Sequence, residues 1–207
     1  MDLDRLWLEA LQEVVNRAAH ELKDSLNGVS LNLEVVRSRA SSRVIDMESL
    51  AAFSTSAAEQ LELLSLRAEA VLFLARPARD TADVAVTLRH LAALLVPATR
   101  AEGGRLTVQC QQVSAPTTAS ARATRLALAA TLLRFTDNGG SARCTLEVAA
   151  ETVVRFSHES AGSVEPDAEV AAALAEQCIR MEKSGAELLM VFPVAAPPGG
   201  SAASGIA

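Results

Sequence analysis

Residues 8–36 read LEALQEVVNRAAHELKDSLNGVSLNLEVV, and this stretch decides the fold. Its apolar residues recur at steps of three and four: Leu8, Leu11, Val15, Ala18, Leu22, Leu26, Val29, Leu33 and Val36. Such steps draw one apolar seam along a helix. The seam is heptad-like, which is typical of long helices that pack against other long helices in a bundle or coiled coil.

A second periodic run follows a polar turn at residues 38–43. It begins near Asp46 and repeats its apolar residues at threes and fours as far as Ala75, just before Pro77. Asp46 is a favourable helix start, and Pro77 is a favourable stop. Two helices of about thirty residues each predict an antiparallel hairpin of roughly 40–45 Å, at 1.5 Å per residue.

The apolar stripes of this hairpin are too wide to be covered by one partner helix. Several residues broaden the second helix beyond a single seam: Leu63, Leu66, Ala70, Phe73 and Leu74. A homodimer in which two hairpins form a four-helix bundle would cover them. The alternative is that the hairpin docks onto the rest of its own chain.

The pattern changes after Pro77. Helices are expected at 84–98, 122–135 and 170–181, and strands at 105–111, 142–149, 152–157 and 186–194. Residues 114–120 are expected to form a loop, and Gly185 to close the last helix. This order predicts an α/β sandwich, a mostly antiparallel sheet covered on one face by about three helices.

Three segments follow from these predictions. Residues 1–76 form the helical hairpin and residues 77–195 the α/β domain, whereas the Ala, Pro, Gly and Ser composition of residues 196–207 predicts a disordered tail.

The composition excludes several classes of protein. With 50% hydrophobic residues and a mean hydropathy of +0.22, the chain is too apolar for disorder. A net charge of −6 argues against nucleic-acid binding. Cys110, Cys144 and Cys178 lack metal-ligand spacing and are interpreted as buried apolar residues in a reducing cytoplasm. No run approaches the ~18 apolar residues of a membrane span, and the acidic N-terminus is no signal peptide, so a soluble cytoplasmic protein is expected.

His20 is the residue that could carry chemistry. It lies two residues before Leu22, which puts it roughly 160° around the helix from the seam. Its neighbours at helical spacing are polar, so an exposed imidazole is expected: Asn16, Arg17, Lys23, Asp24 and Asn27. Glu21 could fix the tautomer of the ring and leave the other nitrogen as a nucleophile able to accept a phosphoryl group. The plain alternative is a surface histidine without a role.

Residues 20–29, HELKDSLNGV, resemble the H-box of sensor histidine kinases, H-E-[LI]-[RK]-[NT]-P-L-x-x-[IV]. Asp24 stands where that family has Asn or Thr, which argues against receiver-phosphatase activity. Ser25 stands where the family has a helix-bending proline. The order of hairpin and α/β sandwich is similar to that of a dimerisation and phosphotransfer domain followed by a kinase-type ATP-binding domain.

The nucleotide-binding residues of that family are missing. Residues 129–135 lie where the family's N-box holds Mg²⁺ through an asparagine, but they contain none, and Asn138 falls in a turn. Residues 157–162 keep one glycine at most where the family has D-x-G-x-G. Too few residues separate Gly162 from Val170 for an ATP lid. The resemblance therefore implies a degenerate ATPase fold that does not phosphorylate itself.

Taken together, the chain resembles the dimeric histidine phosphotransferases of the ChpT type. The resemblance implies a phosphorelay in which His20 carries the phosphoryl group between receiver aspartates and Glu21 stabilises the imidazolium. Four residues are expected to contact the receiver or its phosphoryl group: Arg17, Lys23, Asp24 and Asn27. The expected partners are response-regulator receivers and a second copy of the chain, and not ATP, nucleic acid or a membrane; no cofactor is expected, because the receiver supplies Mg²⁺.

Two alternatives stay open at this point. The chain could be a non-catalytic adaptor that binds or sequesters a response regulator, or an active kinase with an unusual ATP site. His90 and His158 are interpreted as structural, and residues 137–140 as a turn and not a calcium loop.

Overall fold

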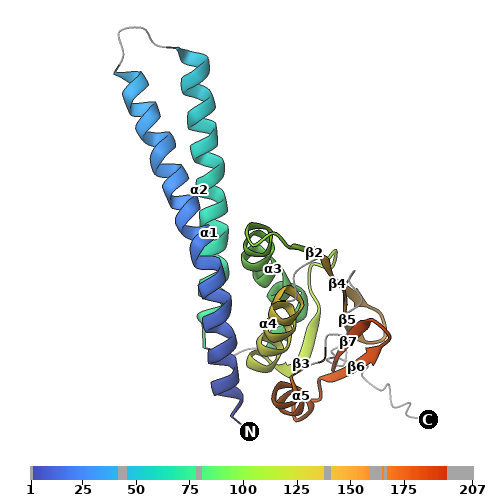
Figure 1. The fold of residues 1–207 in the computed structure, drawn as a ribbon. Coiled ribbons are helices and arrows are strands. Elements are labelled where there is room, and N and C mark those ends of the chain that lie inside the picture. Colours follow the sequence, from blue (N-terminus) through green and yellow to red (C-terminus); the bar gives the residue numbers. More distant parts are fainter. Residues whose placement is uncertain are drawn as a thin grey trace, which may run out of the picture.

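The computed structural model describes residues 2–41, 46–77, 81–137, 141–158, 165 and 167–194. A long helical hairpin stands beside a compact α/β region, which lies against its lower half (Figure 1). The hairpin consists of α1 (Leu3–Ala40, 38 residues) and α2 (Met47–Ala75, 29 residues). The side chain of Asp46 accepts a hydrogen bond from the Ser49 backbone N–H and caps α2, as predicted. The predicted turn at residues 38–43 is wrong at its start, because α1 continues through Ala40; residues 42 and 43 lie outside the described residues.

The α/β region is the predicted sandwich. Its five-stranded sheet has the order β2 (Arg105–Gln109), β4 (Ser141–Val148), β5 (Thr152–His158), β7 (Glu187–Phe192), β6 (Arg180–Ser184). Only the β2–β4 pair is parallel among these neighbours. Three helices cover one face: α3 (Val84–Ala101), α4 (Ala121–Asp137) and α5 (Ala168–Ala175) (Figure 1). The predicted fold class is confirmed.

The predicted loop at 114–120 is wrong, because β3 (Pro116–Ser120) pairs there with β1 (Thr81–Asp83). Thr117 and Ala119 of β3 are buried, and their neighbours are exposed. The buried positions of this strand carry a threonine and an alanine and no large apolar residue, so the hydropathy pattern of the sequence shows no alternation there.

The predicted helix at 170–181 is also wrong in its second half. α5 ends at Ala175, and Cys178 adopts a left-handed backbone (φ +58°) that turns the chain into β6. β6 is an edge strand rich in charge, which gives little strand signal. Gly185 (φ +62°) consequently lies in the β6–β7 hairpin turn and does not close a helix.

The lower half of the hairpin and the α/β region share one hydrophobic core. α1 packs against α3 and α4, and α2 packs against α3. Buried hairpin residues join the same apolar cluster as those of α3, α4 and the sheet: Leu6, Trp7, Ala10, Val14, Ala18, Ala70 and Leu74. Docking onto the same chain, the alternative to a dimer, therefore occurs for the lower half of the hairpin.

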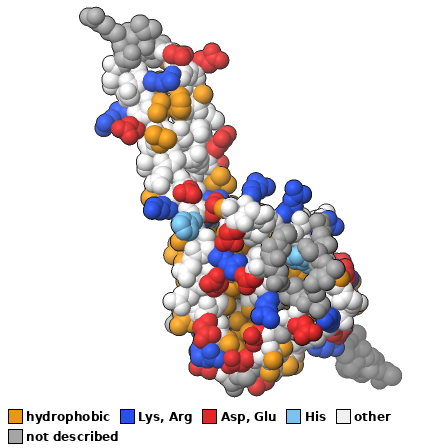
Figure 2. Space-filling view, in the orientation of Figure 1, with side chains coloured by type: hydrophobic (Ala, Val, Ile, Leu, Met, Phe, Trp, Pro, Cys, Tyr) orange, Lys and Arg blue, Asp and Glu red, His pale blue; other side chains and the backbone are white. Residues whose placement is uncertain are grey.

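This docking shifts the buried face of α1 away from the predicted seam. Of the predicted seam, Ala18 and Val29 are buried. Leu8, Leu26 and Leu33 of the seam are exposed, whereas Trp7 and Val14, which lie outside it, are buried. Two apolar stripes lie side by side on α1, and the α/β region covers one of them. Figure 2 shows hydrophobic side chains on the surface of the upper hairpin, beyond the α/β region.

Among the described helices, α3 is long and apolar enough to cross a membrane, judged by length and composition alone. Half of this helix is buried inside the protein, and Leu88, Leu91 and Leu95 belong to the shared core. α3 is thus placed as a core helix of the sandwich.

The three cysteines differ in environment. Cys144 is buried, and burial raises the pKa of its thiol, as does the neighbouring Cys110. Cys110 is half-buried and Cys178 is exposed, so the interpretation of all three as buried apolar residues is wrong for Cys178.

Candidate functional site

His20 lies near the middle of α1, and its side chain is exposed, as predicted. Lys23, Asp24 and Asn27 are also exposed and lie within about 60° of His20 around the helix, at 100° per residue. Within the described part of the chain, the His20 ring makes no hydrogen bond or ion pair. The structure therefore brings these four residues onto one open face of the hairpin, with the imidazole free to meet another molecule.

Arg17 lies one turn below His20, but its side chain points to the α/β region. Its guanidinium is only 15% exposed and bonds the side chains of Thr136 (2.9 Å) and Asp137 at the end of α4, and Glu13 (2.8 Å) on α1. Burial lowers the pKa of Arg17, but the bonds to Asp137 and Glu13 outweigh it and raise the pKa. Arg17 thus anchors α1 to α4 and marks the point where the α/β region approaches the His20 face.

Glu21 follows His20 in the chain, but its side chain turns toward α2. One Glu21 carboxylate oxygen lies 3.6 Å from Nη2 of Arg67, and the Glu21 side chain is only 19% exposed. The predicted hydrogen bond between Glu21 and the His20 ring is not among the contacts of the described residues. The carboxylate is therefore paired with an arginine on the neighbouring helix.

Ser25, at the position where the H-box pattern has proline, also takes part in this contact. Its hydroxyl donates to the Glu21 carbonyl (2.8 Å) and accepts from Nη1 of Arg67 (2.5 Å), which also donates to that carbonyl (3.0 Å). Sequence reasoning missed Arg67. One signal was available: Arg67 lies three residues after Leu64 and four before Val71, so the helical period places its charge on the apolar face of α2.

His90 is part of the packing between α2 and α3. Its ring stacks on Phe73 with centroids 4.2 Å apart, and Arg125 lies over the same Phe73 ring. Burial lowers the pKa of His90, and the nearby Arg89 lowers it further. His158 ends β5 opposite Ala142 and is half-buried. Both placements agree with structural roles.

A small space lies between α5 and α4, the helix that holds the residues compared with the N-box. The space there is about 20 Å³, room for about one water molecule. Its described lining residues come from both helices and two strands: Ala130, Thr131, Arg134, Glu165, Asp167, Val170, Met181 and Leu188. Asn138 and residues 159–164, which the sequence argument also invoked, lie outside the described residues.

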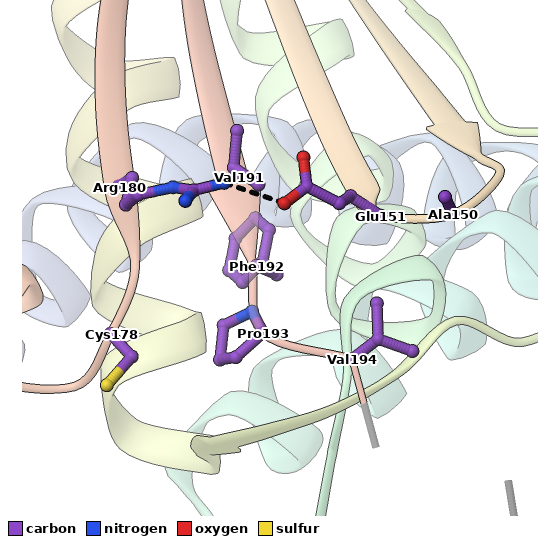
Figure 3. A pocket seen from close by; sticks show the side chains of 8 residues that line it. All are labelled: Ala150, Glu151, Cys178, Arg180, Val191, Phe192, Pro193 and Val194. Atoms are coloured by element: carbon purple, nitrogen blue, oxygen red, sulfur yellow. Dashed lines mark hydrogen bonds and ion pairs between the residues drawn. The ribbon is translucent and has the colours of Figure 1, made fainter. Parts of the chain in front are cut away.

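A larger hollow, of about 540 Å³, opens at the ends of β5, β6 and β7 (Figure 3). The ion pair between Glu151 and Arg180 (2.7 Å) crosses it, and Phe192 and Pro193 line it. None of the six predicted site residues borders this hollow. Across the described ranges, no three His, Cys, Asp or Glu side chains gather as metal ligands.

Comparisons with known proteins found similarity among solved structures. No family model matches the chain, and no curated protein matches it in sequence. Among solved structures, the Acinetobacter baumannii histidine kinase AdeS is similar, with a TM-score of 0.37 and 13% sequence identity over 86% of this chain and 98% of that one.

Proposed function

We propose that this protein is a histidine phosphotransferase of a two-component phosphorelay, which passes a phosphoryl group between receiver aspartates through His20 without using ATP. One observation carries the proposal: an exposed imidazole in an H-box-like string stands at mid-height of a long helical hairpin, beside Lys23, Asp24 and Asn27. A docked receiver could reach this face without any movement of the shared core.

The transfer step needs little from this chain. A nitrogen of neutral His20 attacks the phosphorus of a receiver's aspartyl phosphate in line; the P–N bond forms as the P–O bond breaks, and the aspartate leaves as a carboxylate. The other ring nitrogen keeps its proton, so the ring becomes a phosphoimidazolium. Lys23 offsets charge on the phosphoryl oxygens, and the receiver holds the Mg²⁺. A second receiver aspartate then takes the phosphoryl group by the reverse step.

The proposal includes a homodimer in the cytoplasm. Leu26 and Leu33 of α1 and Leu61 and Leu72 of α2 are exposed. On each helix, these leucines lie roughly 80–160° around the axis from the residues that contact the other helix, and in the same rotational direction. Because the two helices are antiparallel, this places all four leucines on one side of the hairpin. His20 lies about 120–140° around α1 from Leu26 and Leu33, so a dimer formed through the leucines leaves His20 open.

Labelling tests the proposal. The wild type, His20→Ala and His90→Gln, which removes a different imidazole, are each mixed with ATP alone or with phosphorylated receivers of the same organism, and acid-labile phosphate is followed. We expect label from a receiver on the wild type and His90→Gln, and none on His20→Ala. Label from ATP alone would make the protein a kinase. Receiver binding with no label would favour the adaptor and overturn the proposed transfer.

A further inference from the structure

The turn of α1 that carries His20 is held by one buried arginine of α2. Arg67 is 9% exposed, and its Nη1 donates to the Glu21 carbonyl (3.0 Å) and the Ser25 hydroxyl (2.5 Å). Its Nη2 lies 3.6 Å from the Glu21 carboxylate. One side chain thus contacts backbone, hydroxyl and carboxylate within the five residues that follow His20.

This contact is a poor choice if its only purpose is to hold two helices together. Burying an ion pair costs desolvation that the attraction between its charges barely offsets, and apolar side chains of similar size often stabilise a fold as well or better. A hydrogen bond farther up the hairpin shows a simpler solution, because Asn32 donates to the Ser56 hydroxyl (3.2 Å) with no charge involved. The charge of Arg67 therefore calls for another reason.

The charges around His20 supply that reason. Arg67 is the only basic residue of α2, which also carries Glu48, Glu59, Glu62 and Glu69. Without Arg67, the half-buried Glu21 carboxylate, on the residue that follows His20, would lose its partner. An arriving phosphoryl group is itself anionic, so an unpaired carboxylate on the residue next to His20 would repel it.

We propose that Arg67 is a positioning residue for phosphoryl transfer at His20. It acts from α2, through Glu21 and Ser25, by fixing the helical turn that presents the imidazole and by neutralising the carboxylate of the residue that follows His20. The inference rests on the proposed function and adds a residue from the second helix to the site.

Four variants test the inference: Arg67→Gln, Arg67→Lys, Glu21→Gln and the double variant Arg67→Gln/Glu21→Gln. The phosphorylated receiver that labels the wild type serves as donor, and the rate at saturating receiver is measured at low and high salt. The melting temperature of each variant is recorded alongside the rate.

We expect Arg67→Gln to transfer about tenfold more slowly than the wild type at low salt, the factor that corresponds to about 1.4 kcal/mol of unscreened repulsion. High salt should recover part of this loss. Glu21→Gln sets the reference rate in the absence of the carboxylate. The double variant should transfer at close to this reference rate and faster than Arg67→Gln, because no unpaired carboxylate is left. Arg67→Lys, which keeps the charge, should fall between Arg67→Gln and the wild type.

Two results would overturn the inference while leaving the proposed function intact. One is a folded Arg67→Gln that transfers at the wild-type rate at both salt concentrations. The other is a double variant as slow as the single one with no dependence on salt, which would assign Arg67 to stability alone. If the wild type itself takes no label, the proposed function fails, and the inference falls with it. Should Arg67→Gln not fold, Arg67→Lys and the double variant decide.

Discussion

His20 and His90 differ in the surroundings of their rings. His20 stands exposed on α1, whereas His90 is half-buried, stacked on Phe73 and close to Arg89. Solvent can deliver a proton or a reactant to the first ring. The second ring is held between two helices, where a positive charge is unfavourable.

His90 should make the protein less stable in mild acid. Because burial lowers the pKa of His90 below its ordinary value of 6.5, the unfolded chain binds this proton more readily than the folded one. The free energy of unfolding therefore keeps its full value above about pH 6.5 and decreases as the pH falls from there toward the lowered pKa of His90. Urea unfolding of the wild type and His90→Phe at pH 7.5 and 5.5 measures this.

His90→Phe keeps an aromatic ring for the stack but cannot bind the proton. We expect a smaller loss of stability between the two pH values in this variant than in the wild type. His20→Ala is the control and should lose as much as the wild type. An equal loss in His90→Phe and the wild type would assign the acid sensitivity to other groups.

The capping aspartates of α2 and α3 differ in how many hydrogen bonds they make. Asp46 caps α2 at an exposed site through one bond to the Ser49 N–H (3.2 Å). Asp83 caps α3 through the Val86 N–H (2.8 Å) and also accepts from the Ala115 N–H (3.1 Å) and the Ser114 hydroxyl. Asp83 therefore joins the start of α3 to the segment that leads into β3.

Removing the two caps should have unequal effects. We expect Asp46→Ala to lower the free energy of unfolding by about 0.5–1 kcal/mol, and Asp83→Ala by about 2 kcal/mol, because the second change also leaves the Ala115 N–H without its acceptor. Urea denaturation at neutral pH measures both. Equal losses would show that the bonds to 114 and 115 contribute nothing to stability.

The whole molecule is built on a core shared by the lower hairpin and the sandwich. Trp7, Val14 and Leu74 of the hairpin join Leu88 and Leu91 of α3 in this core. At the surface, Arg17 bonds Asp137, Arg122 bonds Asp4 and Arg5 bonds Glu169. The α/β region is thus fixed to the hairpin, and among the described residues the side of the hairpin that carries Leu26, Leu33, Leu61 and Leu72 stays uncovered.

The proposed dimer should depend on that side alone. We expect a mass of about twice 21.7 kDa by light scattering. The double variant Leu26→Asp/Leu61→Asp places charges in the proposed interface. Both leucines are about half exposed in the single chain (53% and 52%), so the single chain should still fold. This double variant should run as a monomer.

A control for the dimer lies on the same helix. Leu31 (64%) is more exposed than Leu26 (53%), but it lies within about 20° of His20 around α1, on the other side of the hairpin. Leu31→Asp should therefore remain dimeric. Loss of the dimer in Leu31→Asp, or its persistence in the double variant, would place the interface elsewhere.

Sequence alone determined what depends on neighbours along the chain. The presence of both hairpin helices and the exposure of His20 follow from periodicity, because a helix brings residues three and four apart together whatever surrounds it. The start of α2 follows from the capping residue Asp46. The class of the sandwich follows from the order of its elements.

Tertiary structure decided what depends on residues far apart in the chain. It selected which of two adjacent apolar stripes on α1 is buried, since only the docked sandwich distinguishes Val14 from Val15. It turned residues 116–120 and 180–184 into strands by pairing them with partners. It also paired Glu21 with Arg67, 46 residues away, and not with the adjacent His20, because folding brings the Arg67 guanidinium within reach of the Glu21 carboxylate.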